Sequence, residues 1–190
     1  SSSLPADVHA GQAVYSRRVL RLYDWWVLGF SNRCVWRCPT RCLEELYRRH
    51  LSRNHLDVGV GTGYFLDRCG PAGDDKSAPP RIALMDVNPT CLETAAQRIA
   101  RYRPQSLLRN ILKPIAVDGP PFNSIALNYV LHCLPGTMAG KAVVFDHLRP
   151  LLAPGGVIFG STILAGGIAP NLMARQLMAA YNRKGIFGNR

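Results

Sequence analysis

The strongest constraint in this sequence is the stretch from His55 to Gly63, where a short apolar run ends in an acid and three glycines follow at alternate positions. The run predicts a β-strand, and Tyr64 opens an apolar helical segment directly after the last glycine. A turn of this kind brings backbone amides close to a ligand at the carboxyl edge of a sheet, because a side chain at a glycine position would block the approach or forbid the dihedrals. A tight turn without any ligand is the alternative.

Two common nucleotide-binding motifs do not fit this turn. A dinucleotide fingerprint, Gly-x-Gly-x-x-Gly counted from Gly59, requires a glycine where the chain has Tyr64. A Walker loop is excluded because no Gly-Lys-Ser/Thr closes the turn. The pattern that remains is acid-x-Gly-x-Gly-x-Gly, beginning at Asp57. In this respect the sequence resembles the class I S-adenosylmethionine (SAM) dependent methyltransferases.

A second acid strengthens the resemblance. The segment from Arg81 to Asp86 reads as the next strand, and it too ends in a carboxylate. In a β-α-β unit such an acid faces the sugar of a bound nucleoside, where it can accept hydrogen bonds from both ribose hydroxyls. Val87 would then pack against the adenine. A helix cap before Pro89 is the competing explanation for Asp86.

The order of the remaining signals also resembles this family, from about residue 12 to residue 165. The resemblance implies an α/β fold with a Rossmann-like, doubly wound, mostly parallel sheet in the order 3-2-1-4-5. The family's final hairpin of strands six and seven has no counterpart in the sequence, so we expect either a longer natural protein, which we favour, or a five-stranded form. A single SAM-binding domain is expected over 1–190, with an N-terminal helical cover (1–52), a Rossmann-like core (53–165) and a C-terminal helix (166–190).

The resemblance assigns cofactor contacts to residues along the whole core. It implies that the turn and strand-end residues hold the ligand: Asp57, Gly59, Gly61, Gly63, Asp86 and Val87. Asn110 and Ile111 follow the third strand, where many members carry an Asp that accepts from the adenine amino group, and the Asn110 amide oxygen could accept in its place. Asn128 and Tyr129 end the fourth strand, beside the methionyl group, and would supply backbone carbonyls to its ammonium.

Three further side chains are candidates for the functional site, and each also has a plain structural role as its alternative. In many small-molecule members N-terminal helices cover the open mouth of the sheet, so Tyr23 and Trp36 are candidates to line the cofactor and acceptor pocket, with ordinary core packing as the alternative. His132 follows the fourth strand and is the candidate general base. A helix-start histidine that merely hydrogen-bonds a neighbouring carbonyl is its alternative role.

Composition limits the partners. The formal charge of +11 would favour anionic partners, but the arginines alternate with apolar positions as on solvated helix faces. Cys34, Cys38 and Cys42 could share a helix face, yet Pro39 interrupts the run and no histidine completes a zinc set, so we expect no metal and ordinary buried thiols in a reducing cytoplasm. The uncharged stretch 151–174 contains prolines and glycine pairs, which indicates a buried strand and loop, not a membrane span.

The functional prediction is a methyltransferase that moves the SAM methyl group to oxygen or nitrogen of a small molecule, leaving S-adenosylhomocysteine (SAH). An RNA methyltransferase that uses the basic surface and a non-catalytic SAM-binding protein are the alternatives. Asn128-Tyr129-Val130-Leu131 lacks the Asn/Asp-Pro-Pro-aromatic signature common in base amino methylation, which argues against nucleic acid. The sequence leaves the oligomeric state open, a dimer included.

Overall fold

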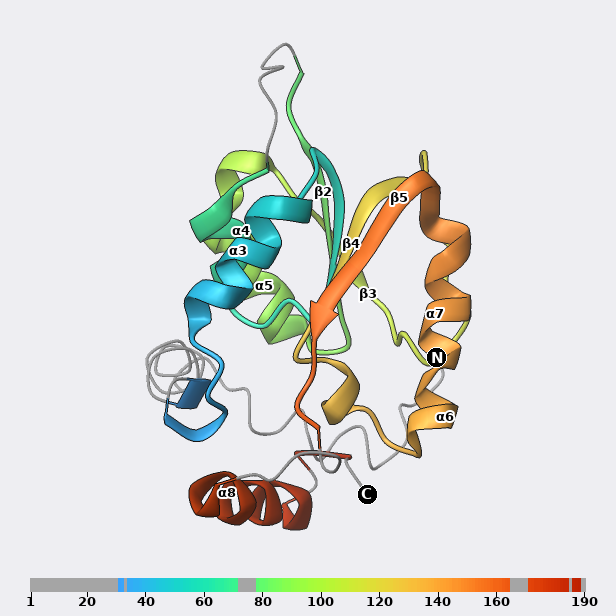
Figure 1. Ribbon diagram of the computed structural model, residues 1–190. Coiled ribbons are helices and arrows are strands. Elements are labelled where there is room, and N and C mark those ends of the chain that lie inside the picture. The colour runs from blue at the N-terminus through green and yellow to red at the C-terminus, as the bar shows by residue number, and fades with distance from the viewer. Residues whose placement is uncertain (1–30, 33, 72–77, 165–170, 185, 189–190) are drawn as a thin grey trace.

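A computed structural model describes residues 31–32, 34–71, 78–164, 171–184 and 186–188. Its centre is a five-stranded, wholly parallel sheet in the order β3-β2-β1-β4-β5 (Figure 1). This is the predicted fold class and strand order. The strands are β1 (Asn54–Val58), β2 (Arg81–Asp86), β3 (Gln105–Leu108), β4 (Phe122–Asn128) and β5 (Leu152–Ser161).

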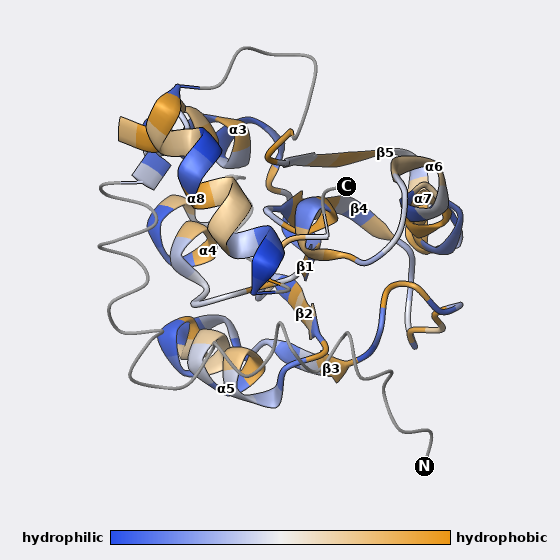
Figure 2. Ribbon diagram, turned by 90° about the horizontal axis from the view of Figure 1, so that it is seen from below, coloured by the Kyte–Doolittle hydropathy of each residue, from blue (hydrophilic) through white to orange (hydrophobic). Residues whose placement is uncertain are grey.

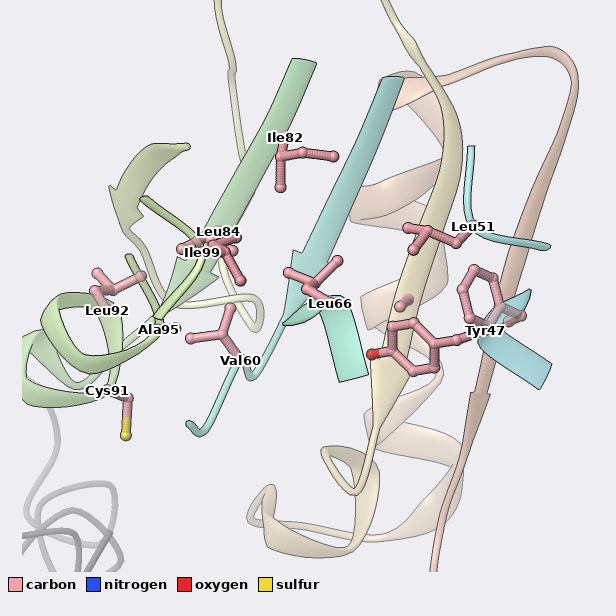
Figure 3. Packing of buried hydrophobic residues seen from close by; sticks show 12 residues of the cluster. Tyr47, Leu51, Val60, Leu66, Ile82, Leu84, Cys91, Leu92, Ala95 and Ile99 are labelled. Carbon is pink, nitrogen blue, oxygen red and sulfur yellow. The ribbon is translucent and has the colours of Figure 1, made fainter. Parts of the chain in front are cut away.

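Alternate residues of the central strands enter two separate cores, because side chains of a strand point to opposite faces. In β2, Ile82 and Leu84 lie in the first core, whereas Ala83 and Met85 lie in the second. Figure 3 shows the first core, in which the β2 side chains meet those of the helices after β1 and β2. Strands buried on both faces explain the nearly unbroken apolar runs of the sequence.

Helices α3 (Thr40–His50), α4 (Tyr64–Cys69) and α5 (Pro89–Arg98) cover the first face. In α3, Leu43 and Tyr47 are buried one turn apart, and Pro39 precedes the first helical residue, where a missing amide proton costs nothing. This helix packs against α4 and β5. Helix α3 belongs to the N-terminal segment that was predicted as a cover, and it packs directly on the first face of the sheet.

On the opposite side of the sheet lies α7 (Val143–Leu148), which packs Val144 and Leu148 into the second core and follows the short helix α6 (Met138–Lys141) (Figures 1 and 2). The expected helix over 137–150 is thus present with a single-residue interruption at Ala142, whose backbone stays helical. It ends in a short 3₁₀ turn, η4 (Arg149–Leu151).

Two short 3₁₀ turns and one further helix complete the elements of the described residues. The expected helix over 90–102 ends earlier, and its last part is the 3₁₀ turn η2 (Ala100–Tyr102). Another turn, η3 (Leu131–Cys133), follows β4. Helix α8 (Leu172–Arg183) lies beyond the carboxyl ends of the strands, at the bottom of Figure 1. Within the described residues β5 is an edge strand, and no sixth or seventh strand is found there.

Candidate functional site

A cavity opens at the carboxyl edge of the sheet, where β1 and β4 lie side by side and their following chains diverge to opposite faces. Ligands of open α/β sheets bind at such crossover points. The lining residues come mainly from the turns after β1, β2, β3 and β4, with Tyr47 of α3 and Ile186 near the C-terminus. They include nine of the residues predicted to bind the cofactor: Asp57, Gly59, Gly61, Asp86, Val87, Asn110, Ile111, Asn128 and Tyr129.

The three glycines of the turn have the left-handed φ values 69°, 51° and 73°, so each is favoured over an L-residue by its backbone alone. Their surroundings differ. A Cβ on Gly61 would meet nothing within 4 Å and Gly61 lines the cavity, which leaves its backbone open to a ligand. A Cβ on Gly59 would collide with Val130, and one on Gly63 would lie 3.0 Å from the Cα of Ala95.

Gly63 is therefore a packing glycine. It precedes α4 and permits the close approach of α5 through Ala95, and it does not line the cavity. Of the three glycines that the sequence assigned to the ligand, Gly59 and Gly61 line the cavity and Gly63 does not.

Asp86 stands at the end of β2 and faces the cavity. Burial raises the pKa of its carboxyl to about 6, against the opposing effect of backbone amide donors that include Asn88. The amide of Asn88 donates to Asp86 Oδ1 at 2.9 Å. The helix-cap alternative for Asp86 is wrong, because the side chain of Asn88 caps α5 by accepting from Thr90. The second acid is thus left for another role.

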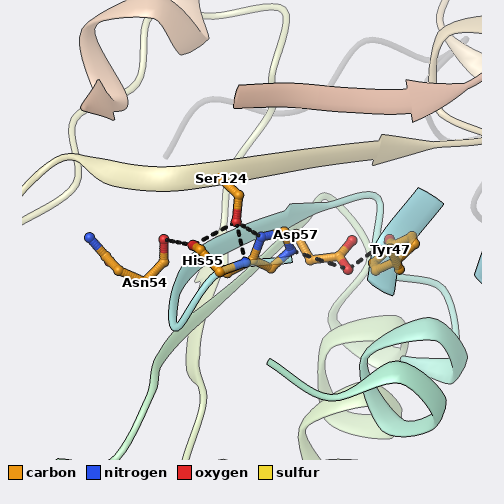
Figure 4. Close-up of polar contacts among 6 residues, drawn as sticks. Tyr47, Asn54, His55, Asp57 and Ser124 are labelled. Carbon is orange, nitrogen blue, oxygen red and sulfur yellow. Dashed lines mark hydrogen bonds and ion pairs between the residues drawn. The ribbon is translucent and has the colours of Figure 1, made fainter. Parts of the chain in front are cut away.

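Asp57, at the cavity end of β1, is held from α3. The Tyr47 hydroxyl donates to Asp57 Oδ2 at 3.0 Å (Figure 4). Burial and then the charge of Asp57 raise the pKa of the Tyr47 phenol well above its ordinary value, so the phenol keeps its proton and remains a donor. The sequence gives no sign of this contact, because Tyr47 is spaced with Leu43 and Leu51 on the apolar side of a helix.

β4 ends at Asn128, whose side-chain amide is only partly paired among the described residues, and the next residue, Tyr129, has an unusual backbone conformation. The carboxamide oxygen of Asn128 accepts from Ser161 at 2.8 Å, while its buried nitrogen Nδ2 has no acceptor among the described residues. Tyr129 is a non-glycine residue at φ 57°. This backbone conformation costs free energy, and residues that adopt it cluster at functional sites. Its hydroxyl donates to Asn32 at 2.8 Å, which ties the chain before α3 to the cavity.

On the side of β3, Asn110 and Ile111 line the cavity. The side-chain oxygen of Asn110 already accepts from the backbone amide of Leu112 at 2.9 Å. The oxygen that was expected to read an adenine amino group therefore has one of its two acceptor positions filled within the turn.

Besides Gly63, two predicted residues lie away from the cavity, and one lies outside the described part of the chain. Trp36 does not line the cavity, and its ring lies 6.2 Å from that of Phe187. His132 is only 3% exposed, packs edge-on against Phe187 at 4.5 Å and accepts at Nδ1 from the amide of Ile163. Tyr23 is outside the described residues.

The environment of His132 is also unfavourable for proton transfer. Burial, and then the charge of Lys141, lower its pKa to about 3, so the imidazole is a weak base. His132 lies just after the cavity-facing end of β4, but its ring is turned into the packing beneath the cavity. Neither the general-base role nor the carbonyl-bonding alternative matches its contacts.

The cysteines were expected to be buried thiols, and this is wrong for some of them. Cys34, Cys42 and Cys133 are exposed, whereas Cys91 is buried in the first core. Within the described ranges, no three His, Cys, Asp or Glu side chains gather as a metal-binding group. In the same part of the chain, every helix is too short or too polar to cross a bilayer.

A parallel sheet wound on both faces, with two acids and a glycine turn at its crossover, defines a nucleoside-binding α/β protein. Solved structures share this fold. The DhpI–SAH complex superposes with a TM-score of 0.61 at 14% identity, over 85% of this chain and 72% of that one. The N-methyltransferase NodS of Bradyrhizobium japonicum WM9, bound to SAH, gives 0.56 at 24% identity, over 80% and 71%.

Sequence relatives identify the family. A methyltransferase domain model matches residues 56–158. The demethylluteothin O-methyltransferase of Streptomyces thioluteus is 35% identical over 180 residues, or 94% of this chain and 76% of the relative. The physcion biosynthesis cluster O-methyltransferase of Aspergillus chevalieri is 38% identical over 181 residues, or 94% and 79%. The chain belongs to the methyltransferase domain family and is a class I SAM-dependent methyltransferase, which confirms the predicted class and cofactor.

Proposed function

We propose that the cavity binds SAM with its adenosyl end at β2 and β3 and its methionyl end at β1 and β4. The observation that carries this placement is the pair of strand-end carboxylates, Asp57 and Asp86, on one cavity that is also open at Gly61. Asp86 would accept from the ribose hydroxyls, Val87 and Ile111 would pack against the adenine, and Asp57 would face the ammonium group.

We further propose that the methyl acceptor is an oxygen of a small biosynthetic intermediate. The support is chemical and comparative: two relatives that match over most of their length are named O-methyltransferases. The cavity also has an apolar wall beside Tyr129, formed by Leu134, Pro135 and Ile186, against which a hydrophobic acceptor could pack. Nucleic acid is disfavoured as a substrate, and we place the reaction in the cytoplasm.

The chemistry makes modest demands on the protein. When bound, SAM supplies a methyl group on a sulfonium, which an aligned nucleophile displaces in line. The protein's task is to hold both reactants close together and to keep water out. Tyr129 is well placed to do both, since its strained backbone lies at the cavity and its side chain is fixed by Asn32. No general base is assigned, because His132 lies outside the cavity.

Calorimetric titration of the full chain with SAM and SAH tests the cofactor site. Mass spectrometry of reactions with a panel of phenolic, hydroxylated and amine-bearing metabolites, and in parallel with RNA, tests the acceptor. We expect micromolar or tighter binding of SAH and a mass gain of one methyl group on a hydroxyl compound. Transfer to RNA alone, or SAH binding without transfer to any compound class, would contradict the proposed function.

The matched control for this assay is Asp118→Ala. Asp118 is a carboxylate in the loop before β4 and does not line the cavity. Its substitution should leave both SAH affinity and transfer unchanged, whereas Asp86→Ala should weaken both. Equal losses in the two variants would mean that general destabilisation, and not the site, explains the effect.

A further inference from the structure

A chain of buried polar groups runs beneath the cavity on the face of the sheet covered by α3. His55 lies two residues before Asp57 in β1, so both side chains point to this face, and His55 pairs in register with Ser124 of β4. His55 and Ser124 are both completely buried. Figure 4 shows the sequence of contacts from the serine through the imidazole and Asp57 to Tyr47. His55 itself does not line the cavity.

The hydrogen bonds around Ser124 determine that the Nδ1 atom of His55 carries a proton. The Ser52 hydroxyl donates to the carbonyl of Asn54 at 2.8 Å and also lies 2.7 Å from the Ser124 hydroxyl. Because a hydroxyl has one proton, Ser124 must be the donor in the second contact. The Ser124 hydroxyl therefore has no proton left for His55 Nδ1, which lies 2.8 Å from its Oγ. The same oxygen also accepts from the Ser52 amide. Only a proton on Nδ1 satisfies all four contacts.

The other ring nitrogen then faces a carboxylate. His55 Nε2 is buried, has no hydrogen-bond partner in the described part of the chain and lies 3.8 Å from Asp57 Oδ2. In a neutral ring with its proton on Nδ1, Nε2 would present a lone pair to a negatively charged oxygen. A second proton on Nε2 replaces this repulsion with attraction and gives the buried carboxylate a counter-charge.

Among the described residues, the surroundings of His55 supply no competing partner for that proton. The elements packed against His55 bring the Tyr47 ring of α3 and the Phe159 ring of β5, at 6.4 and 5.9 Å, and His50 of α3 lies beyond Phe159. The Tyr47 hydroxyl is already committed to Asp57 Oδ2. Asp57 and Asp86 also repel each other across the cavity, which makes a buried cation beneath Asp57 more favourable.

We propose that His55 is a positioning residue: as a buried imidazolium it holds Asp57 ionised and, together with Tyr47, fixes Oδ2 so that the other oxygen faces the cofactor's ammonium. Both contacts engage Oδ2, and Oδ1 takes part in no hydrogen bond among the described residues, although Asp57 lines the cavity. The role in cofactor binding rests on the proposed function, whereas the protonation state of His55 does not.

Nitrogen-15 NMR of the ring tests the protonation state directly. In the ligand-free full chain, labelled at its five histidines, the His55 signals are those lost in His55→Asn. We expect both ring nitrogens of His55 to carry the shifts and couplings of protonated nitrogens at neutral pH. A neutral ring of either tautomer would overturn the proposal, whatever the protein binds.

Two amide substitutions separate the two ring nitrogens in function. The side-chain nitrogen of His55→Asn reaches the place of Nδ1 and keeps the bond to Ser124, while that of His55→Gln reaches the place of Nε2 and can donate to Asp57. We expect His55→Gln to bind SAH within about threefold of the original chain and His55→Asn to bind at least about tenfold more weakly, as for loss of a donor to a charged group. A merely structural histidine would not show this difference.

His50→Gln is the control, since His50 contacts the same Phe159 ring but not Asp57. Its SAH affinity should be unchanged. Equal SAH affinity of His55→Asn and His55→Gln, with thermal unfolding confirming that both are folded, would overturn the positioning role. If the original chain fails to bind SAH, the proposed function fails, and the NMR result still decides whether His55 is an imidazolium.

Discussion

Substituting alanine at Gly61 and at Gly63 should separate ligand contact from packing within one turn. Both residues have left-handed backbones, so each alanine costs about 1 kcal/mol of strain. At Gly63 the new Cβ also lies 3.0 Å from the backbone of Ala95, and overpacking of this kind costs about 2 kcal/mol more. At Gly61 the Cβ enters open space at the cavity instead.

These strain and overpacking costs give the expected loss of stability for each variant. Gly63→Ala should lose about 3 kcal/mol of stability, which for a chain of this size lowers Tm by about 6–12 °C, whereas Gly61→Ala should lower it by about 2–4 °C. SAH affinity should change in the opposite order. Gly61→Ala should bind about tenfold more weakly or worse, because its methyl group occupies space that the ligand needs, and Gly63→Ala should bind within about threefold once folded.

Thermal unfolding followed by circular dichroism, and calorimetric titration with SAH well below each Tm, supply the two measurements. The reasoning is refuted if Gly61→Ala loses as much stability as Gly63→Ala while retaining full affinity. Such a result would mean that the open space at Gly61 is not part of the cofactor site.

Four further predictions concern the second acid and the core. Asp86→Ala should weaken SAM binding by roughly 1–3 kcal/mol, measured by titration, and an unchanged affinity in a folded variant would remove Asp86 from the site. Because the folded pKa of Asp86 is raised to about 6, SAM affinity should fall as pH drops from 7 to 5, and Asp86→Asn should abolish that dependence. The same pKa shift stabilises the ligand-free fold at low pH. This contribution to the free energy of unfolding is fully present below pH 3.8 and is lost as the pH rises through 6. Unfolding measurements on Asp86→Asn across this range should lack this pH dependence. Leu84→Ala, at a fully buried position of β2, should cost about 2–5 kcal/mol in denaturant unfolding with no loss of affinity in the folded fraction.

Much of the fold could be predicted because its signals are local. The strand from Arg81 to Asp86 and the helix from Tyr64 to Cys69 begin and end where the sequence indicated, since an acid, a proline or a glycine stands at those ends. Boundaries without such residues shifted, as in the helix that follows Pro89, which gives way to a 3₁₀ turn after Ile99.

Within the site, the sequence identified residues whose position depends on the backbone of a strand end. Asp57, Asp86 and Asn128 face the cavity because parallel strands bring their carboxyl ends to one edge. Side chains whose direction depends on packing were not predictable in this way. His132 follows β4 as expected, yet its ring turns away from the cavity to pack on Phe187, more than fifty residues later in the chain.

The sequence by itself determined the class of this protein, because the glycines that alternate after an acid-ended strand resemble those of one methyltransferase family, and that resemblance implied the strand order. Only the tertiary structure decided which glycines line the cavity, which residue caps α5 and what lies beneath Asp57. Each of these depends on a contact with another segment, such as Gly63 with Ala95 or His55 with Ser124. Such contacts depend on where distant side chains meet in space, and local sequence patterns carry no information about that.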